Sequence, residues 1–164
     1  MNGSDRNDLL ALCRKDLQAR KEGYLAELRS LDEAAAGETK SSAGDKYETG
    51  REMIAQSRNL IQRNLAEMLS QLEALERMAH MAGMAGEARP AEADSPDRIG
   101  FGTLVETGSG WVLVGISLGD VDFQGLPIRT ASLASPLGAA LRGRRLGDRI
   151  PWRGGQLEIT RIIR

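Results

Sequence analysis

Hydrophobic residues recur at every seventh position in two stretches of the first 82 residues. The row in residues 5–36 consists of Leu10, Leu17, Tyr24 and Leu31. The row in residues 45–82 consists of Ile54, Ile61, Met68 and Leu75. Side chains seven positions apart lie on one side of a helix, so each stretch predicts a long helix with one apolar stripe. The run GETKSSAG at 37–44 has nothing to bury and predicts a break between them.

Two helices joined by a short polar turn fold back on each other, because each alone would leave its apolar stripe in water. We therefore expect residues 1–82 to form an antiparallel coiled-coil hairpin with an acidic tip near 38–49. Residues 83–98, GMAGEARPAEADSPDR, lack periodicity and collect Gly, Ala, Pro and acids. That composition is typical of a linker between domains.

The pattern after residue 98 changes to short alternating or β-branched runs. They span 102–107, 111–116, 121–123, 128–131, 149–152 and 157–163. Such runs predict strands. Ser135 is a favourable N-cap and Pro136 a favourable first helical residue, so PLGAAL at 136–141 predicts one short helix. Residues 99–164 are therefore expected to form a small β-rich domain, which makes the whole chain an α+β protein.

Composition and charge narrow the possible functions. Residues 1–98 hold 14 Lys/Arg and 18 Asp/Glu, a net of −4, and residues 99–164 hold 8 Arg and 5 Asp/Glu, a net of +3. The overall charge of −1 argues against electrostatic binding of nucleic acid over the whole surface. Cys13 is the only cysteine, and no stretch approaches the roughly 20 apolar residues of a membrane span. We expect a cytoplasmic protein that binds no membrane.

Two carboxylates stand three positions apart where the second helix is predicted to begin. Asp45 and Glu48 would share one helical face and could present oxygens to a hard divalent cation. Acids in the first turn also complement the positive end of a helix dipole without binding any metal. The spacing alone leaves both interpretations open.

A second motif occupies residues 135–148, SPLGAALRGRRLGD, in the predicted β-rich domain. It contains Ser-Pro, a short helix with Ala-Leu, then Gly followed by a basic residue, and Gly-Asp before a strand. Together with Gly44, Asp45 and Glu48, and in the same order along the chain, this motif resembles the Gre transcript-cleavage factors. The resemblance covers both halves of the chain except the linker, and it implies an FKBP-like fold for residues 99–164.

The resemblance also implies a mechanism. The C-terminal domain would bind bacterial RNA polymerase near the mouth of its secondary channel, and the hairpin tip would reach the active site. Asp45 and Glu48 would hold a magnesium ion jointly with the polymerase and orient the water that cleaves backtracked RNA, which is two-metal chemistry. The protein would have no activity of its own, would meet nascent RNA only through the polymerase, would bind no specific DNA sequence, and would be a monomer.

Residues of the second motif are the candidates for binding the polymerase. They are Ser135, Pro136, Leu137, Arg142, Arg144 and Arg145. The first three could shape a docking surface or only begin the short helix. The arginines could meet an acidic partner surface or only keep a loop solvated.

The tip departs from the family's pattern. Tyr47 replaces a small or aliphatic residue, and Lys46 could pair with either acid. Gly50 weakens the start of the helix by about 1 kcal/mol relative to alanine. Two alternatives therefore stay open: a channel-binding regulator that does not stimulate cleavage, and a coiled-coil adaptor with an inert tip.

Prolyl isomerase is the enzymatic alternative, because an FKBP-like domain could bind proline in an apolar pocket lined by rings. The rings of this domain are Phe101, Trp111, Phe123 and Trp152. They are scattered along the sequence, and aromatic residues make up only 4 % of the chain. The sequence therefore predicts no such pocket.

Overall fold

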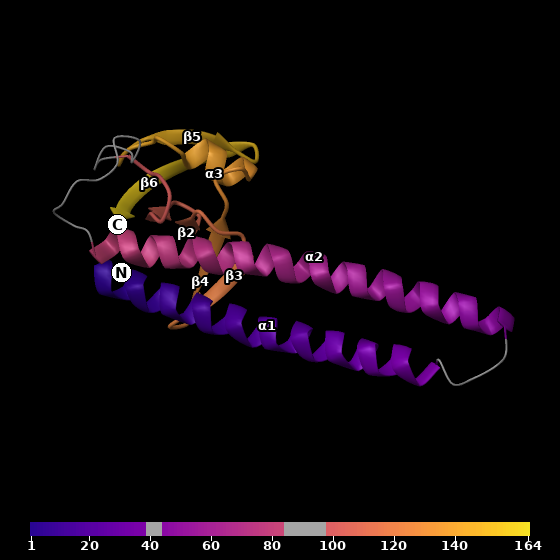
Figure 1. Cartoon of the computed structure of the whole chain (residues 1–164). Coiled ribbons are helices and arrows are strands. Elements are labelled where there is room, and N and C mark those ends of the chain that lie inside the picture. Colours follow the sequence, from indigo (N-terminus) through magenta and orange to yellow (C-terminus); the bar gives the residue numbers. More distant parts are fainter. Residues whose placement is uncertain (39–43, 84–97) are drawn as a thin grey trace. The chain divides into compact units, whose positions relative to one another are not determined.

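The computed structural model describes the backbone of residues 1–38, 44–83 and 98–164, and within it the side chains of 1–36, 50–81 and 98–164 (Figure 1). The elements in chain order are α1 (Gly3–Glu38), α2 (Gly44–Gly83), β1 (Leu104–Thr107), β2 (Gly110–Val114), β3 (Asp120–Phe123), β4 (Leu126–Ala131), α3 (Pro136–Leu141), β5 (Arg149–Trp152) and β6 (Gly155–Ile163). The predicted α+β fold, a helical hairpin followed by a β-rich domain, is confirmed. Residues 39–43 of the predicted break and 84–97 of the predicted linker lie outside the described residues.

The chain divides into two compact units. The first, which we call the helical unit, is Lys15–Leu72. The second combines Met1–Arg14 with Glu73–Arg164, and we call it the β-rich unit. The β-rich unit thus includes the first turns of α1 and the last turns of α2.

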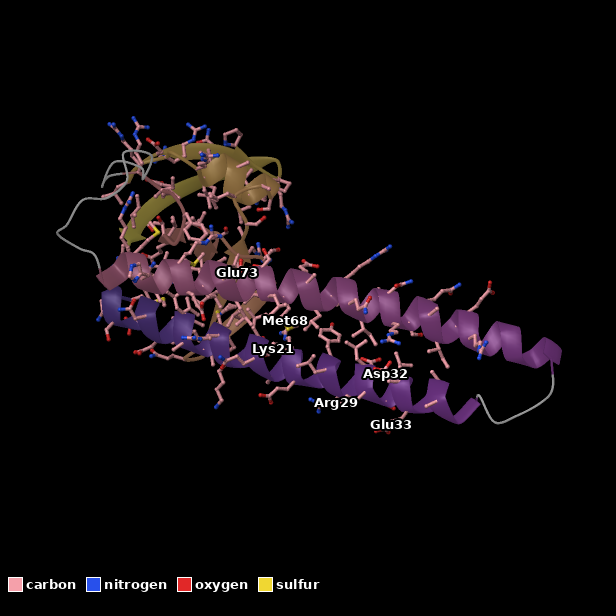
Figure 2. The ribbon with its side chains drawn as sticks, viewed as in Figure 1. Lys21, Arg29, Asp32, Glu33, Met68 and Glu73 are labelled. Atoms are coloured by element: carbon pink, nitrogen blue, oxygen red, sulfur yellow. The ribbon has the colours of Figure 1, made fainter. Side chains whose placement is uncertain are left out.

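In the helical unit, α1 and α2 pack along the predicted apolar stripe. Leu17, Ile61 and Met68 are buried there, and Figure 2 shows Met68 between the two helices. An ion pair of 2.9 Å between Arg58 of α2 and Asp32 of α1 also links the helices. All three buried residues belong to the sevenfold rows, so the predicted inward face of each helix is confirmed.

The β-rich unit contains a six-stranded sheet in the order β3-β4-β2-β1-β6-β5. β2 and β4 are parallel, and every other neighbouring pair is antiparallel. The register of β1 against β6 shifts between Glu106 and Thr107, which marks a bulge. All six predicted strands and the predicted short helix are present.

The central strand β2 is buried on both faces. One face packs against α3 in a core formed by Ile99, Val105, Val112, Val114, Ala131, Leu137, Leu141, Ile150, Leu157 and Ile159. Alternate residues of β2, Trp111 and Leu113, point to the other face and are buried too. Just after β2, a Cβ added to Gly115 would lie 2.4 Å from Cε of Met78, so α2 packs closely here.

Arg6 ties the helical part of the β-rich unit to its sheet part. Its side chain is buried, and Nε donates to the Gly102 carbonyl at 2.7 Å while Nη2 donates to the Met78 carbonyl at 3.3 Å. Nη1 donates to Oδ1 of Asn7 at 3.2 Å. Burial lowers the pKa of Arg6. Two backbone carbonyl oxygens and one side-chain amide oxygen accept hydrogen bonds from the buried guanidinium. A buried charged group needs such partners because its removal from water is costly.

Candidate functional site

The predicted acidic pair lies at the start of the second helix. Asp45 and Glu48 belong to the first turns of α2, which begins at Gly44. Their side chains fall outside the described residues, so the magnesium site remains a prediction. Among the side chains that the structure describes, no group of three His, Cys, Asp or Glu residues could hold a metal ion.

α3 begins at the predicted residue because Ser135 caps it. Oγ of Ser135 accepts a hydrogen bond from the Gly138 amide at 3.1 Å and donates one to the Ser132 carbonyl at 2.7 Å. Pro136 occupies the first turn, where its missing N–H costs nothing. A Cβ on Gly138 would lie 2.0 Å from the Ser132 carbonyl oxygen, so α3 can pack this closely only with glycine there.

The three candidate docking residues at the start of α3 differ in accessibility. Leu137 is only 7 % exposed and belongs to the core beneath the helix. Pro136 is exposed, and Ser135 is half-buried with its hydroxyl engaged in the cap. A partner at this site would therefore contact mainly Pro136.

The arginines after α3 gather with a fourth that the sequence analysis placed in the linker. We call this set the arginine cluster; it consists of Arg98, Arg142, Arg144 and Arg145. The Gly143 amide donates to the Ile99 carbonyl at 2.7 Å, and the Ile99 amide donates to the Arg144 carbonyl at 2.8 Å. Nη1 of Arg98 donates to the Gly143 carbonyl at 2.9 Å. These bonds hold Arg98 beside the loop that carries the other three.

A tight turn spans Arg145–Asp148. The Asp148 amide donates to the Arg145 carbonyl at 3.1 Å, and Oδ2 of Asp148 accepts from the Arg145 amide at 2.9 Å. The Gly147 amide donates to the Ile159 carbonyl and the Ile159 amide to the Asp148 carbonyl, at 2.8 and 3.0 Å. Four hydrogen bonds therefore fix the turn, while Leu146 inside it is 63 % exposed.

The arginine cluster differs from three arginines of the sheet in its lack of ion pairs with described residues. The three sheet arginines each form an ion pair: Arg129 with Asp120, Arg149 with Glu158, and Arg161 with Glu106. Within the part of the chain that the structure describes, no carboxylate comes within ion-pair distance of a cluster guanidinium.

Trp111 and Trp152, which lie 41 positions apart, line one pocket of about 110 Å³. An ion pair of 3.0 Å between Arg129 and Asp120 also lines it. The hydrogen bond from Arg129 lowers the pKa of Asp120, and the same bond raises the pKa of Arg129. An ion pair in so small a pocket leaves little apolar surface for a prolyl ring. The isomerase alternative gains no support from it.

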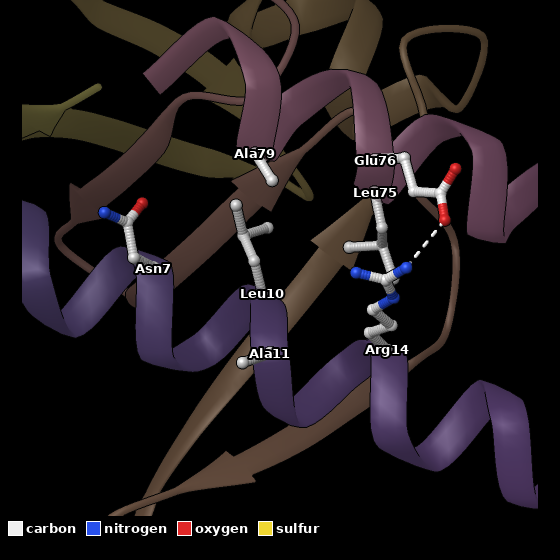
Figure 3. A pocket seen from close by; sticks show the side chains of 7 residues that line it. All are labelled: Asn7, Leu10, Ala11, Arg14, Leu75, Glu76 and Ala79. Atoms are coloured by element: carbon white, nitrogen blue, oxygen red, sulfur yellow. Dashed lines mark hydrogen bonds and ion pairs between the residues drawn. The ribbon is translucent and has the colours of Figure 1, made fainter. Parts of the chain in front are cut away.

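A groove of about 370 Å³ lies between α1 and α2 in the β-rich unit (Figure 3). Leu10 of α1 and Leu75 of α2 line it; both are buried and lie between the two helices. Arg14 and Glu76 form an ion pair of 2.8 Å across one end. The side chain of Asn7, also in the lining, accepts from Arg6. The polar side chains of the groove are therefore already engaged with one another or with their neighbours.

A scan of the sequence against models of known protein families finds no match. Searches of curated proteins and of solved structures find no significant match either. None of the helices in the described residues combines the length and apolar character needed to cross a membrane.

Proposed function

We propose that this protein binds bacterial RNA polymerase through the secondary channel and promotes hydrolysis of backtracked RNA, in the manner of Gre-type factors. The observation that carries the proposal is the motif Gly44-Asp45 with Glu48 at the start of the second of two long helices. The order of the remaining elements supports it, because a β-rich domain with a Ser-Pro-capped helix and a basic loop follows.

The lengths of the helices suit a protein that must reach into a channel. α1 has 36 residues and α2 has 40. At about 1.5 Å per residue these helices are about 54 and 60 Å long. Helices this long exceed what a small globular core needs.

Asp45 and Glu48 have the chemistry of magnesium ligands. Magnesium is commonly bound by one or two carboxylates and keeps its other positions for water and for ligands from a partner or substrate. Positions three apart on a helix are neighbours, so carboxylates at positions 45 and 48 of a helix would be able to share one ion. A bound magnesium ion supplies an activated water and neutralises charge on the phosphate. The two carboxylates would hold the ion and orient the water, and the polymerase would provide the remaining ligands.

A second candidate is a channel-binding regulator that does not stimulate cleavage. Lys46 between the two acids and Gly50 just after them favour this alternative, since one could neutralise a carboxylate and the other weakens the helix start. The adaptor alternative, with an inert tip, predicts that neither acid matters for any activity.

The test uses a purified bacterial elongation complex that has been stalled and backtracked, with magnesium and the full-length protein. We expect shortened RNA with the wild type and loss of cleavage with Asp45→Ala/Glu48→Ala. Glu52→Ala, which removes an acid one turn further along α2, is the matched control and should cleave like the wild type.

The outcomes separate the candidates. If the double variant binds polymerase and cleaves as the wild type does, the acidic pair has no catalytic role. If the wild type binds without cleaving, the regulator alternative replaces the cleavage factor. If the wild type does not bind polymerase, the proposal is wrong and the adaptor remains.

A further inference from the structure

We propose that the pocket lined by Trp152, Arg129 and Asp120 binds one pyrimidine base, carried by a free nucleotide or by single-stranded RNA. The inference does not rest on the proposed function, because it involves neither the acidic pair nor the polymerase. The resemblance implied contact with RNA only through the polymerase, so a base bound here would be an additional and direct contact.

The register of the sheet builds one side of the pocket. Val112 of β2 pairs with Arg129 of β4, and Arg129 pairs with Asp120 of β3, so the three residues form one row across the strands. Residues paired directly across neighbouring strands point to the same face of a sheet. Val112 belongs to the core beneath α3, so the row lies on the face that α3 covers. The ion pair of Arg129 with Asp120 therefore stands at the edge of the sheet, beside an apolar core.

Two apolar side chains line the pocket from other elements. Leu137 of α3 is buried in the core, and Trp152 of β5 is half-buried and packs against the same core. An indole ring that is held by a core and still borders a pocket is a flat platform on which a base can stack. Every base has such a face, so stacking on Trp152 accounts for binding of a ring, and the polar groups beside it must select which ring.

The ion pair offers hydrogen-bonding groups to the edge of a base. Nε of Arg129 donates to Oδ1 of Asp120 at 3.0 Å, and Nη2 donates to Oδ2 at 3.4 Å. These bonds use only part of the hydrogen-bonding capacity of either group. The bond from Arg129 lowers the pKa of Asp120, so at neutral pH the carboxylate is ionised and only accepts. Cytosine presents the complementary edge, because its amino group donates to a carboxylate while the ring nitrogen and carbonyl oxygen beside it accept.

The volume of the pocket favours a pyrimidine over other ligands. About 110 Å³ is far below the roughly 300–1,000 Å³ of pockets for drug-sized molecules. A single six-membered ring suits this volume better than the two fused rings of a purine. A prolyl ring is also small, but it has no polar edge, so Arg129 and Asp120 would lose water without gaining a hydrogen bond.

The experiment titrates the isotope-labelled full-length protein with nucleosides and follows it by two-dimensional NMR, which detects weak binding residue by residue. Cytidine, uridine and adenosine are added up to about 10 mM, because contacts to one base should give a dissociation constant in the millimolar range. Cytidine and uridine should shift the indole N–H of Trp152 and the backbone amides of Asp120 and Arg129, and the shifts should saturate. Adenosine should shift these resonances less at equal concentration.

Asp120→Asn tests the polar edge through base preference. The asparagine amide keeps one acceptor oxygen and adds a donor, so it suits the carbonyl groups of uracil but accepts less well from the amino group of cytosine. The dissociation constant for cytidine should rise about fivefold, and that for uridine should stay within about twofold of the wild type. Asp122→Asn is the matched control, because Asp122 lies on the same strand outside the lining of the pocket. It should bind both nucleosides as the wild type does.

Trp152→Leu tests the stacking platform. Loss of the indole should weaken binding of cytidine about tenfold, measured from the backbone amides of Asp120 and Arg129. A melting curve checks that the variant is folded. If Trp152→Leu does not fold, the change of base preference in Asp120→Asn decides the proposal, since an ion pair with only a structural role would not produce it.

Two further ligands distinguish the sources of the base. If an oligocytidylate RNA of about five nucleotides binds at least about tenfold more tightly than cytidine monophosphate, the site belongs to single-stranded RNA. Equal affinities assign it to free nucleotides. The proposal is overturned if no nucleoside shifts the pocket resonances, or if adenosine shifts them as strongly as cytidine. It is also overturned if ribose phosphate or a short proline-containing peptide shifts them as strongly, because the ligand would then be a phosphate or a peptide.

Discussion

The helical unit buries one stripe of each helix, whereas the β-rich unit buries its central strand on both faces. Among the described residues of Lys15–Leu72, the buried hydrophobic side chains are Leu17, Ile61 and Met68. In the β-rich unit four consecutive residues of β2, from Trp111 to Val114, are all buried. Sequence changes should therefore be tolerated at most positions of the helical unit and at few positions inside the sheet. The residues that could do chemistry or bind partners in the β-rich unit are confined to its loops and edges.

The largest effect should come from Gly138→Ala in the β-rich unit. The added Cβ would lie 2.0 Å from the Ser132 carbonyl oxygen, which is backbone and cannot swing aside. Because α3 would have to shift away from Ser132, the free energy of unfolding should fall by about 3 kcal/mol. Urea unfolding followed by tryptophan fluorescence measures it, because Trp111 and Trp152 both lie in this unit.

Gly108→Ala is the control for that experiment. Its Cβ would have no heavy atom within 4 Å. If both alanine variants unfold at the same urea concentration, the close packing of α3 does not determine the stability of this unit.

A smaller effect is expected from the helical unit, where two adjacent residues give a matched pair. Ile61 is 4 % exposed and Leu60 is 60 % exposed. Ile61→Ala should cost about 2 kcal/mol, the low end for a buried isoleucine, because two helices can close around the gap. Leu60→Ala should stay within about 0.5 kcal/mol of the wild type. Hydrogen exchange of amides in 50–72 measures the cost, and equal protection in the two variants would refute the single-stripe description.

The difference between the helical unit and the β-rich unit also explains which features could be predicted from the sequence. The sevenfold rows predicted both long helices because burial of one stripe repeats with a fixed period, as Leu17 and Ile61 show. Strands and α3 were predictable from short local runs and from the Ser135 cap. These features are local, so each leaves its own signature in the sequence.

The missed features all depend on contacts between distant segments. Arg98 sits among Asp, Pro and Ser in the sequence, and only the backbone bonds of Ile99 bring it beside Arg144. The sequence does not distinguish Arg6 from other helical arginines, because its acceptors, the carbonyls of Gly102 and Met78, lie far from it along the chain. The pocket shared by Trp111 and Trp152 likewise joins the second strand to the fifth. The magnesium site at the start of α2 could be proposed only from its sequence motif.

The smallest effect should come from Asp120→Asn, at the exposed ion pair with Arg129. The hydrogen bond from Arg129 lowers the pKa of Asp120 from its ordinary value of 3.8. A lowered pKa in the folded state means that the stabilisation is fully present above about pH 4 and is lost as the pH falls through the folded-state pKa. Both side chains are about half exposed, so the variant should lose only a few tenths of a kcal/mol at pH 7. Urea unfolding at pH 7 and at lower pH measures the difference in free energy of unfolding between wild type and Asp120→Asn, which should shrink toward zero in acid.

Asp122→Asn is the control for this experiment, because its amide oxygen can still accept from the Gly125 amide as the carboxylate does. A difference between wild type and Asp120→Asn that grows in acid would show that the ion pair does not stabilise this edge of the sheet.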